Sequence, residues 1–174
     1  MISFSWNFSY TCAMLRYASI DIGSNAVRML FQQIYESESG TIFKKMSLVR
    51  LPIRLGEDAF LKGEITAVKE EKLVHMAHAF IHLCSIFEVQ NYLASATSAM
   101  RDSKNGSAIM DRIKNEVGVE IKIIPGDEEA EVLYESIFNT GKIDDDKTYM
   151  FIDVGGGSTE INIFSNGERK AWKS

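Results

Sequence analysis

The sequence predicts an α/β protein with a mixed β-sheet and flanking helices. Residues 17–55 hold consecutive apolar runs separated by short turns, which is typical of neighbouring strands. Residues 66–138 alternate helical periodicity with short apolar runs. Strands followed by strand–helix alternation favour a sheet with both antiparallel and parallel pairs. A third observation is that residues 19–31 and 151–164 repeat one strand–turn–strand pattern, which indicates two like-folded domains.

The first half of the chain is predicted to form three strands and a long helix. Strands at 17–23 and 26–36 flank a tight turn, and a third strand is expected near 41–55. The segment 66–87 is predicted to be a helix because its apolar residues recur at spacings of three and four. These residues are Leu73, Ala77, Phe80, Cys84 and Phe87.

The second half continues the alternation and then begins a new hairpin. A strand at 91–96, a helix at 106–118 that ends at Gly118, and a strand at 119–125 come first. The next helix begins at "PGDEEA", and a polar connector at 141–147 marks a domain boundary. The apolar stripe of the helix that begins at "PGDEEA" is Ala130, Leu133, Tyr134, Ile137 and Phe138. The last part is predicted to be a hairpin at 148–164, a turn at 165–167 and a final strand.

Composition limits the class of protein. A chain of 174 residues with 45% hydrophobic and 25% charged residues can bury a core and is typical of a soluble globular protein. The net charge of −5 argues against a general nucleic-acid binder. Two cysteines make no disulfide framework, so we expect a reducing, cytoplasmic location.

The first 15 residues are expected to lie outside the folded domain. They carry no positive charge, unlike a signal peptide, and they are too short and too polar to span a bilayer. We therefore interpret residues 1–15 as an N-terminal extension, with Met14 as the natural start, and we expect no membrane partner.

The repeated pattern carries the chemistry. "SIDIGSNAVRMLF" and "FIDVGGGSTEINIF" each place an aspartate and a glycine, Asp21 with Gly23 and Asp153 with Gly155, at the end of an apolar strand. Glycines let backbone N–H groups approach an anion, and neighbouring hydroxyls add donors. An aspartate would repel phosphate unless a divalent cation lay between them, as Mg²⁺ does. The two copies predict two phosphate clamps facing each other across a cleft, although a single copy is usually only a turn.

Two further clusters leave alternatives open. Thr97 and Ser98 follow a strand and precede Arg101, so the hydroxyls either cap a helix or hold phosphate with the arginine. Carboxylates crowd the start of the helix at "PGDEEAEV", where negative charge is favourable, and Asp127 is predicted to cap it. Periodicity places Glu129 near one edge of the apolar stripe, so it could instead point into a cleft as a catalytic base.

The chain from about Arg16 onward resembles the exopolyphosphatase/guanosine pentaphosphate phosphohydrolase (Ppx/GppA) phosphatase family. Five segments carry the resemblance in family order: "DIGSNAVRM", "IRLGEDAFLKGEIT", "ATSAMRDSKN", "IIPGDEEA" and "DVGGGSTE". The resemblance implies a ribonuclease H-like (actin-like ATPase) domain with a mixed five-stranded sheet and flanking helices, plus the first strands of a second similar domain. The expected boundaries are 16–125 for the first domain, 126–147 for the helix and connector, and 148–174 for the start of the second.

The resemblance also implies residue roles. Glu129 matches the family's catalytic base and Arg101 its phosphate-handling arginine, with Asn105 closing that motif. Asp153 and Glu160 match acids that handle metal or water. Arg54 and Gly56 match a further motif, to which we assign no role. The implied phosphate-binding residues are Asp21, Gly23, Ser24, Asn25, Thr97, Gly155, Gly156, Gly157 and Ser158.

The implied reaction is Mg²⁺-assisted hydrolysis of a terminal phosphoanhydride in polyphosphate or guanosine pentaphosphate. A homodimer of the full-length protein is a further expectation. The sequence departs from the family at Ala26, where a second serine is more common, and at Pro125, where serine is common. Because family members carry a complete second domain, the alternatives are an inactive fragment that only binds phosphate ligands, or a sugar or acetate kinase of the same superfamily.

Two other clusters suggest metal sites. His75, His78 and His82 lie along one flank of the long helix, but seven residues of helix rise about 10 Å, which is too far for His75 and His82 to share an ion. We expect a polar helix edge, with a site at His78 and His82 as the alternative. Asp144 to Asp146 are expected to be a charged linker rather than a cation site.

Overall fold

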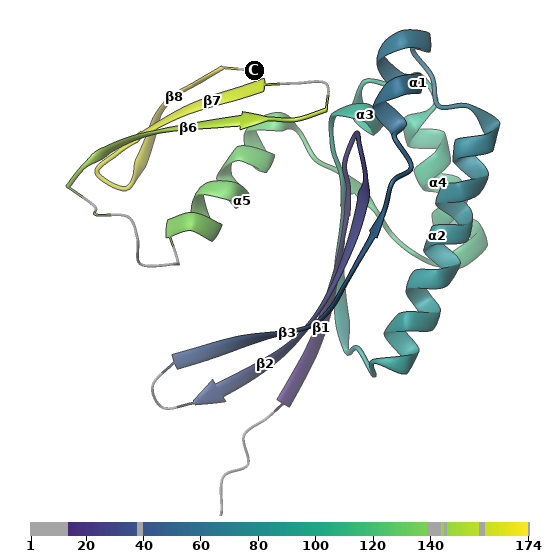
Figure 1. Cartoon of the computed structure of the whole chain (residues 1–174), viewed down its shortest axis with the longest axis horizontal. Coiled ribbons are helices and arrows are strands. Elements are labelled where there is room, and N and C mark those ends of the chain that lie inside the picture. Colours follow the sequence, from purple (N-terminus) through teal and green to yellow (C-terminus); the bar gives the residue numbers. More distant parts are fainter. Residues whose placement is uncertain (1–13, 38–39, 139–143, 145, 157–158, 174) are drawn as a thin grey trace, which may run out of the picture.

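The computed structural model describes residues 14–37, 40–138, 144, 146–156 and 159–173, and for residues 37 and 133–138 it describes the backbone alone. Figure 1 shows two β-sheets with helices beside each of them, and one of these helices connects the two sheets along the chain. Most of the predicted N-terminal extension, residues 141–143 and 145 of the predicted connector, and Gly157 and Ser158 lie outside the described residues. None of the described helices is long and apolar enough to cross a membrane.

The larger sheet has five strands in the order β3-β2-β1-β4-β5. β1 pairs antiparallel with β2, and β2 antiparallel with β3, whereas β4 pairs parallel with both β1 and β5. The mixed five-stranded sheet implied by the resemblance is therefore confirmed. The strands are β1 (Met14–Ile22), β2 (Val27–Ser37), β3 (Gly40–Leu51), β4 (Asn91–Ala96) and β5 (Lys122–Ile123).

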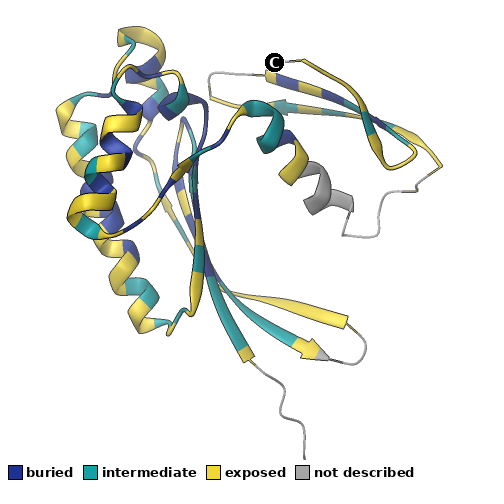
Figure 2. Ribbon diagram, turned by 180° about the vertical axis from the view of Figure 1, so that it is seen from behind, coloured by how far each residue is buried: buried dark blue, intermediate teal, exposed yellow. Residues whose placement is uncertain are grey.

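Helices α1, α2 and α4 gather on one face of this sheet (Figure 1). Alternate residues of β1 and β2 point to that face, and Phe31 stacks against Phe80 of α2 with ring centroids 6.0 Å apart. Figure 2 shows the buried residues concentrated between the sheet and these helices. The helices are α1 (Leu55–Lys62), α2 (Ala67–Ile86), α3 (Ser98–Arg101), α4 (Gly106–Val117) and α5 (Gly126–Phe138).

Two predicted strands are shorter than expected. The third strand ends at Leu51, because Pro52 has no N–H to continue the ladder and α1, which was not predicted, begins at Leu55. The predicted strand at 119–125 pairs only at Lys122 and Ile123, against the last two residues of β4. Its other apolar residues are buried without forming a ladder, so hydrophobicity alone overestimated the strand.

The smaller sheet is an antiparallel meander of β6 (Thr148–Val154), β7 (Thr159–Ser165) and β8 (Glu168–Lys173). The turn before β8 is formed by Asn166 and Gly167, both with positive φ, which suits a tight hairpin. Helix α5 lies against this sheet in Figure 1. It begins at Gly126, so Asp127 lies in its first turn and the predicted cap at Asp127 is wrong.

Candidate active site

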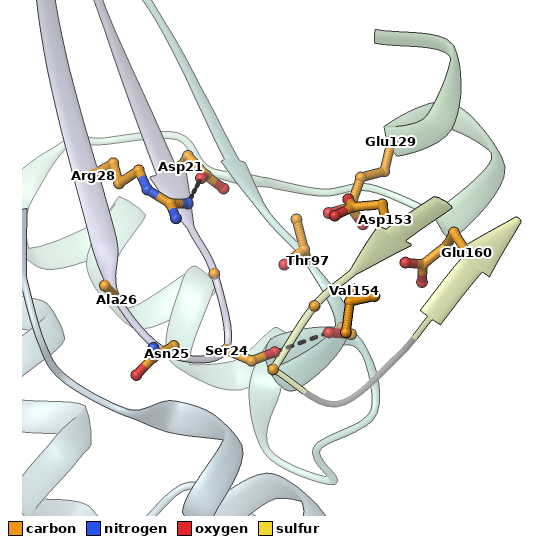
Figure 3. A pocket seen from close by; sticks show the side chains of 14 residues that line it. Asp21, Ser24, Asn25, Ala26, Arg28, Thr97, Glu129, Asp153, Val154 and Glu160 are labelled. Carbon is orange, nitrogen blue, oxygen red and sulfur yellow. Dashed lines mark hydrogen bonds and ion pairs between the residues drawn. The ribbon is translucent and has the colours of Figure 1, made fainter. Parts of the chain in front are cut away.

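The site is a cavity of about 290 Å³ between the two sheets, reached by residues from β1, β2, α3, α5, β6 and β7. Two loops line it: the first loop, residues 23–26 between β1 and β2, and the second loop between β6 and β7, of which Gly155 and Gly156 are described. Figure 3 shows the side chains. The lining residues are Asp21, Gly23, Ser24, Asn25, Ala26, Arg28, Thr97, Ser98, Glu129, Asp153, Val154, Gly155, Gly156 and Glu160.

The first loop is held by backbone hydrogen bonds from the segment that enters α1. The Gly56 N–H donates to the Ser24 carbonyl at 2.7 Å, and the Arg54 N–H donates to the Asn25 carbonyl at 2.9 Å. Arg54 adopts a left-handed conformation with φ 56° to make this approach. The motif that contains Arg54 and Gly56 therefore holds the first loop in place through these two backbone hydrogen bonds.

The third motif joins the first loop through hydroxyl groups. Because β1 and β4 run parallel, their carboxyl ends meet, and the buried Ser98 Oγ lies 2.9 Å from the buried Ser24 Oγ. Thr97 also lies beside β1, where its backbone N–H donates to the Ile22 carbonyl at 3.1 Å. Neither hydroxyl caps α3. The capping alternative is therefore wrong for both.

The two loops approach each other closely. A Cβ built on Gly156 would lie 2.9 Å from the Ser24 Cβ and 3.5 Å from the Asn25 nitrogen. Only glycine fits this contact without displacing a neighbour. Gly155 and Gly156 line the cavity as predicted, whereas Gly157 and Ser158 lie outside the described residues.

Four carboxylates border the cavity. Asp153 and Glu160 face each other in register across β6 and β7, and Glu160 is buried. Asp21 pairs with Arg28 through a 2.9 Å contact between Oδ2 and Nη1. Glu129 projects from the first turn of α5 toward Asp153 (Figure 3). The four predicted acids thus come together from four different elements, β1, α5, β6 and β7.

Burial raises the pKa of the Glu129 carboxyl to about 7. The negative charge of Glu160 adds to this rise, and Asp21 and Asp153 add smaller contributions, whereas the Arg101 guanidinium opposes it. A carboxylate whose pKa lies near neutral pH is suited to accept a proton. Such a shift within a cavity marks a functional-site candidate.

Arg101 and Asn105 do not line the cavity. The Arg101 Nη1 donates to the Ile124 carbonyl at 3.2 Å, and its Nε lies 3.4 Å from the Asp102 carboxylate. The Asn105 amide bonds the backbone of Ile65 at 2.8 and 2.9 Å and so joins α4 to the start of α2. In this structure Arg101 affects the site through its charge and its hold on the backbone.

Sequence reasoning missed Arg28. The sequence could have indicated it, because a four-residue turn between antiparallel strands places Arg28 directly opposite Asp21 in the β1–β2 register.

The three histidines of α2, His75, His78 and His82, are all exposed, as expected of a polar helix edge. Among the described residues, no group of three or more histidine, cysteine or acidic side chains is arranged to hold a metal by itself.

The mixed sheet, its one-sided helices and the paired glycine loops define the actin-like class of fold. The Ppx/GppA phosphatase family matches residues 33–174. The chain belongs to this family.

Solved structures agree with this assignment. The family member from Aquifex aeolicus superposes with a TM-score of 0.78 at 27% identity, covering 92% of this chain and 50% of that one. An exopolyphosphatase from Cytophaga hutchinsonii gives a TM-score of 0.79 at 26% identity, with 91% and 49% covered. The predicted actin-like fold is confirmed by these likenesses.

Three curated relatives are enzymes with different names. A bifunctional 3-dehydroquinate synthase/phosphatase from Fusobacterium nucleatum is 34% identical, with 84% of this chain and 22% of the relative covered. Exopolyphosphatase 1 from Mycobacterium tuberculosis is 28% identical, with 85% and 42% covered. A guanosine-5'-triphosphate,3'-diphosphate pyrophosphatase from Photobacterium profundum is 24% identical, with 84% and 28% covered. This chain therefore spans less than half of each of these relatives.

Proposed function

We propose that this protein is a phosphoanhydride hydrolase that releases terminal orthophosphate from inorganic polyphosphate, guanosine pentaphosphate or both. The observation that carries the proposal is the Glu129 carboxyl, whose pKa is raised to about 7 where it borders a cavity between two glycine loops. Membership of the Ppx/GppA family supports the reaction class. The exopolyphosphatase from Mycobacterium tuberculosis and the pyrophosphatase from Photobacterium profundum suggest the two substrate candidates.

The net negative charge of the residues that line the cavity favours the binding of a divalent cation. Four carboxylates and one arginine line it, so an unaccompanied phosphate would be repelled. Mg²⁺ binds through one or two carboxylates and completes its shell with phosphate oxygens and water, so it needs no cluster of three protein ligands. Asp153 and Glu160 fit this role, because they face each other at the edge of the cavity. A bound Mg²⁺ would offset the charge on the phosphoryl oxygens.

The loops would hold the terminal phosphoryl group. Glycines 155 and 156 and Gly23 leave the backbone accessible to its oxygens, and the hydroxyls of Ser24 and Thr97 lie at the floor of the cavity. Ser24 and Ser98 share one hydrogen bond, so only one of their two hydroxyl protons is used between them. The other proton is free to reach a phosphoryl oxygen. Such positioning carries most of the catalysis in phosphoryl transfer.

Glu129 would act as the general base. A water in line with the terminal phosphorus–oxygen bond attacks phosphorus, and Glu129 takes the proton that this water loses. The bridging bond breaks and its oxygen stays on the shortened chain, so the products are orthophosphate and a polyphosphate one unit shorter. From guanosine pentaphosphate the second product is the tetraphosphate. A positioned base typically contributes 10²–10⁴-fold to the rate.

A phosphate-release assay with three substrates tests this function. We expect release from polyphosphate or guanosine pentaphosphate, with little from ATP, and loss of release when EDTA removes divalent cations. Transfer of the γ-phosphoryl group of ATP to a sugar or acetate acceptor, without release of orthophosphate, would indicate a kinase instead. Binding of polyphosphate without release would indicate that this chain is a binding fragment.

A further inference from the structure

Arg169 of β8 holds the helix that carries Glu129. Its Nη1 donates to the Asp127 carbonyl at 2.9 Å, and its Nη2 donates to the Glu131 carboxylate at 2.8 Å. The Arg169 side chain is only 19% exposed, whereas that of Glu131 is 60% exposed. A partly buried arginine therefore grips the first two turns of α5 at two points.

The two contact points flank Glu129 in sequence. Asp127 and Glu131 are four residues apart, so they lie on one side of the helix. Residues two positions apart on an α-helix project in nearly opposite directions, because each residue turns the helix by about 100°. Holding the helix at 127 and 131 therefore fixes its rotation and directs Glu129 toward the cavity, where Figure 3 places it.

The guanidinium group is itself oriented. Its carbon lies 6.0 Å from the centre of the Trp172 ring, on the same strand. Cation–π contacts of this kind favour arginine and keep its plane in place. Planar geometry matters here, because the two parallel donors reach a carbonyl and a carboxylate at once, which the single ammonium of lysine cannot do in the same way.

Among the described side chains, those of Arg169 and Glu131 form an ion pair between α5 and the small sheet. The backbone of α5 also approaches β7, and Ala130 of α5 is buried. The side chains that continue the predicted apolar stripe, from 133 onward, lie outside the described residues. The relation between Glu129 and the acids of β6 and β7 thus depends on a link from α5 to the sheet, and Arg169 supplies one.

The geometry points to Arg169 as a positioning residue that sets the rotation of α5 and so the direction of the Glu129 carboxylate. The inference rests on the proposed function, in which Glu129 is the base. Arg169 does not line the cavity and touches no substrate. It acts through α5, so its loss should lower turnover and leave substrate binding nearly unchanged.

The test compares Arg169→Met and Arg169→Lys with Lys170→Met. Lys170 is a matched control, because it is the next residue on β8 and its described side-chain partner is Glu168. Since small misplacements of a catalytic group can cost up to 10²-fold, we expect kcat for orthophosphate release to fall about 10- to 100-fold in Arg169→Met, with KM changed less than about threefold. Arg169→Lys should recover part of kcat, and Lys170→Met should match the wild type.

Hydrogen exchange supplies a readout that needs no activity. In Arg169→Met the amides at the start of α5 should exchange faster, while those of β1 and β4 keep their wild-type rates. Unchanged kcat, or α5 exchange equal to that of the wild type, would overturn the inference. An equal rise in KM without a fall in kcat would also overturn it, because Arg169 would then act in binding. If the wild type releases no orthophosphate, the proposed function fails, and the exchange of α5 alone decides whether Arg169 holds the helix.

Discussion

Gly156 and Ser24, 132 residues apart in sequence, bring the two glycine loops into contact: a Cβ on Gly156 would fall 2.9 Å from the Ser24 Cβ. Both loops line the cavity, and this contact sets the distance between them. The prediction from the repeated motif that the loops face each other thus has a specific physical basis, a position at which no side chain fits.

Gly156→Ala should therefore reduce activity more than stability. The added methyl group must push the loops apart, and overpacking of this kind typically costs about 1–3 kcal/mol. If the whole cost falls on the active site, kcat/KM should fall roughly 5- to 150-fold. Because Gly156 is exposed, we expect little change in the midpoint of thermal unfolding.

Gly118→Ala is the matched control for that substitution. A Cβ on Gly118 would meet open space, but its φ of 79° is unfavourable for alanine. We expect a loss of about 1 kcal/mol in the free energy of unfolding and no change in kcat/KM. Equal effects of the two substitutions on activity would contradict the proposed role of the loop contact.

The rate of orthophosphate release should depend on pH through Glu129. Burial raises the pKa of this carboxyl to about 7, and only the deprotonated form accepts a proton. At low divalent-cation concentration we expect kcat to rise with pH with a midpoint near 7. Because a bound cation offsets the neighbouring negative charges, a higher Mg²⁺ concentration should move the midpoint to lower pH.

A pH profile measured at two Mg²⁺ concentrations checks this account. In the Glu129→Gln protein, the residual rate of orthophosphate release should not rise with pH around this midpoint. A midpoint near 4.5 at both concentrations would mean that the carboxyl responsible is fully hydrated, and it would exclude the half-buried Glu129.

Asp58 should contribute strongly to stability at neutral pH. Its carboxylate is buried, where it accepts hydrogen bonds from the backbone N–H of Thr66 at 3.1 Å and from Lys62 at 3.0 Å, and Lys69 lies 3.4 Å away. Burial alone would raise its pKa, but the hydrogen bonds from Thr66 and the two lysines more than offset this and hold the pKa well below the usual range.

Asp58→Ala should lower the free energy of unfolding at pH 7 by about 1–3 kcal/mol, because it removes the acceptor of the hydrogen bonds from Thr66 and Lys62 and leaves Lys69 with one carboxylate, that of Glu57, in place of two. A folded-state pKa below the unfolded value near 3.9 gives stability that is fully present above about pH 4 and is lost as the pH falls further. Urea unfolding at pH 7 and pH 3 measures this. The gap between variant and wild type should narrow at pH 3, and an unchanged gap would show that packing, not charge, is responsible.

The sequence predicted the sheet and most of the site for identifiable reasons. The first loop and Thr97 follow strands β1 and β4, whose apolar runs are unambiguous, and parallel pairing then brings their ends together. The tight turn at Asn166 and Gly167 could also be predicted, because both residue types tolerate positive φ.

What the sequence left open depends on long-range contacts. Arg101 was expected to handle phosphate, but whether its guanidinium faces the cavity or the Ile124 carbonyl depends on how α3 lies relative to the segment that follows β5. The hold of Arg169 on α5 joins residues 42 positions apart in sequence and leaves no local pattern. The short β5 was overestimated because burial without strand pairing gives the same apolar run as a strand.

The most direct test of the central claim is orthophosphate release from polyphosphate by the wild type and by Glu129→Gln, measured side by side with Mg²⁺. Glutamine keeps the size of the side chain and removes the base. We predict that the wild type releases orthophosphate, and that Glu129→Gln is slower by about 10²-fold or more while it binds polyphosphate as tightly. Equal turnover by the two proteins would contradict the assignment of Glu129 as the base.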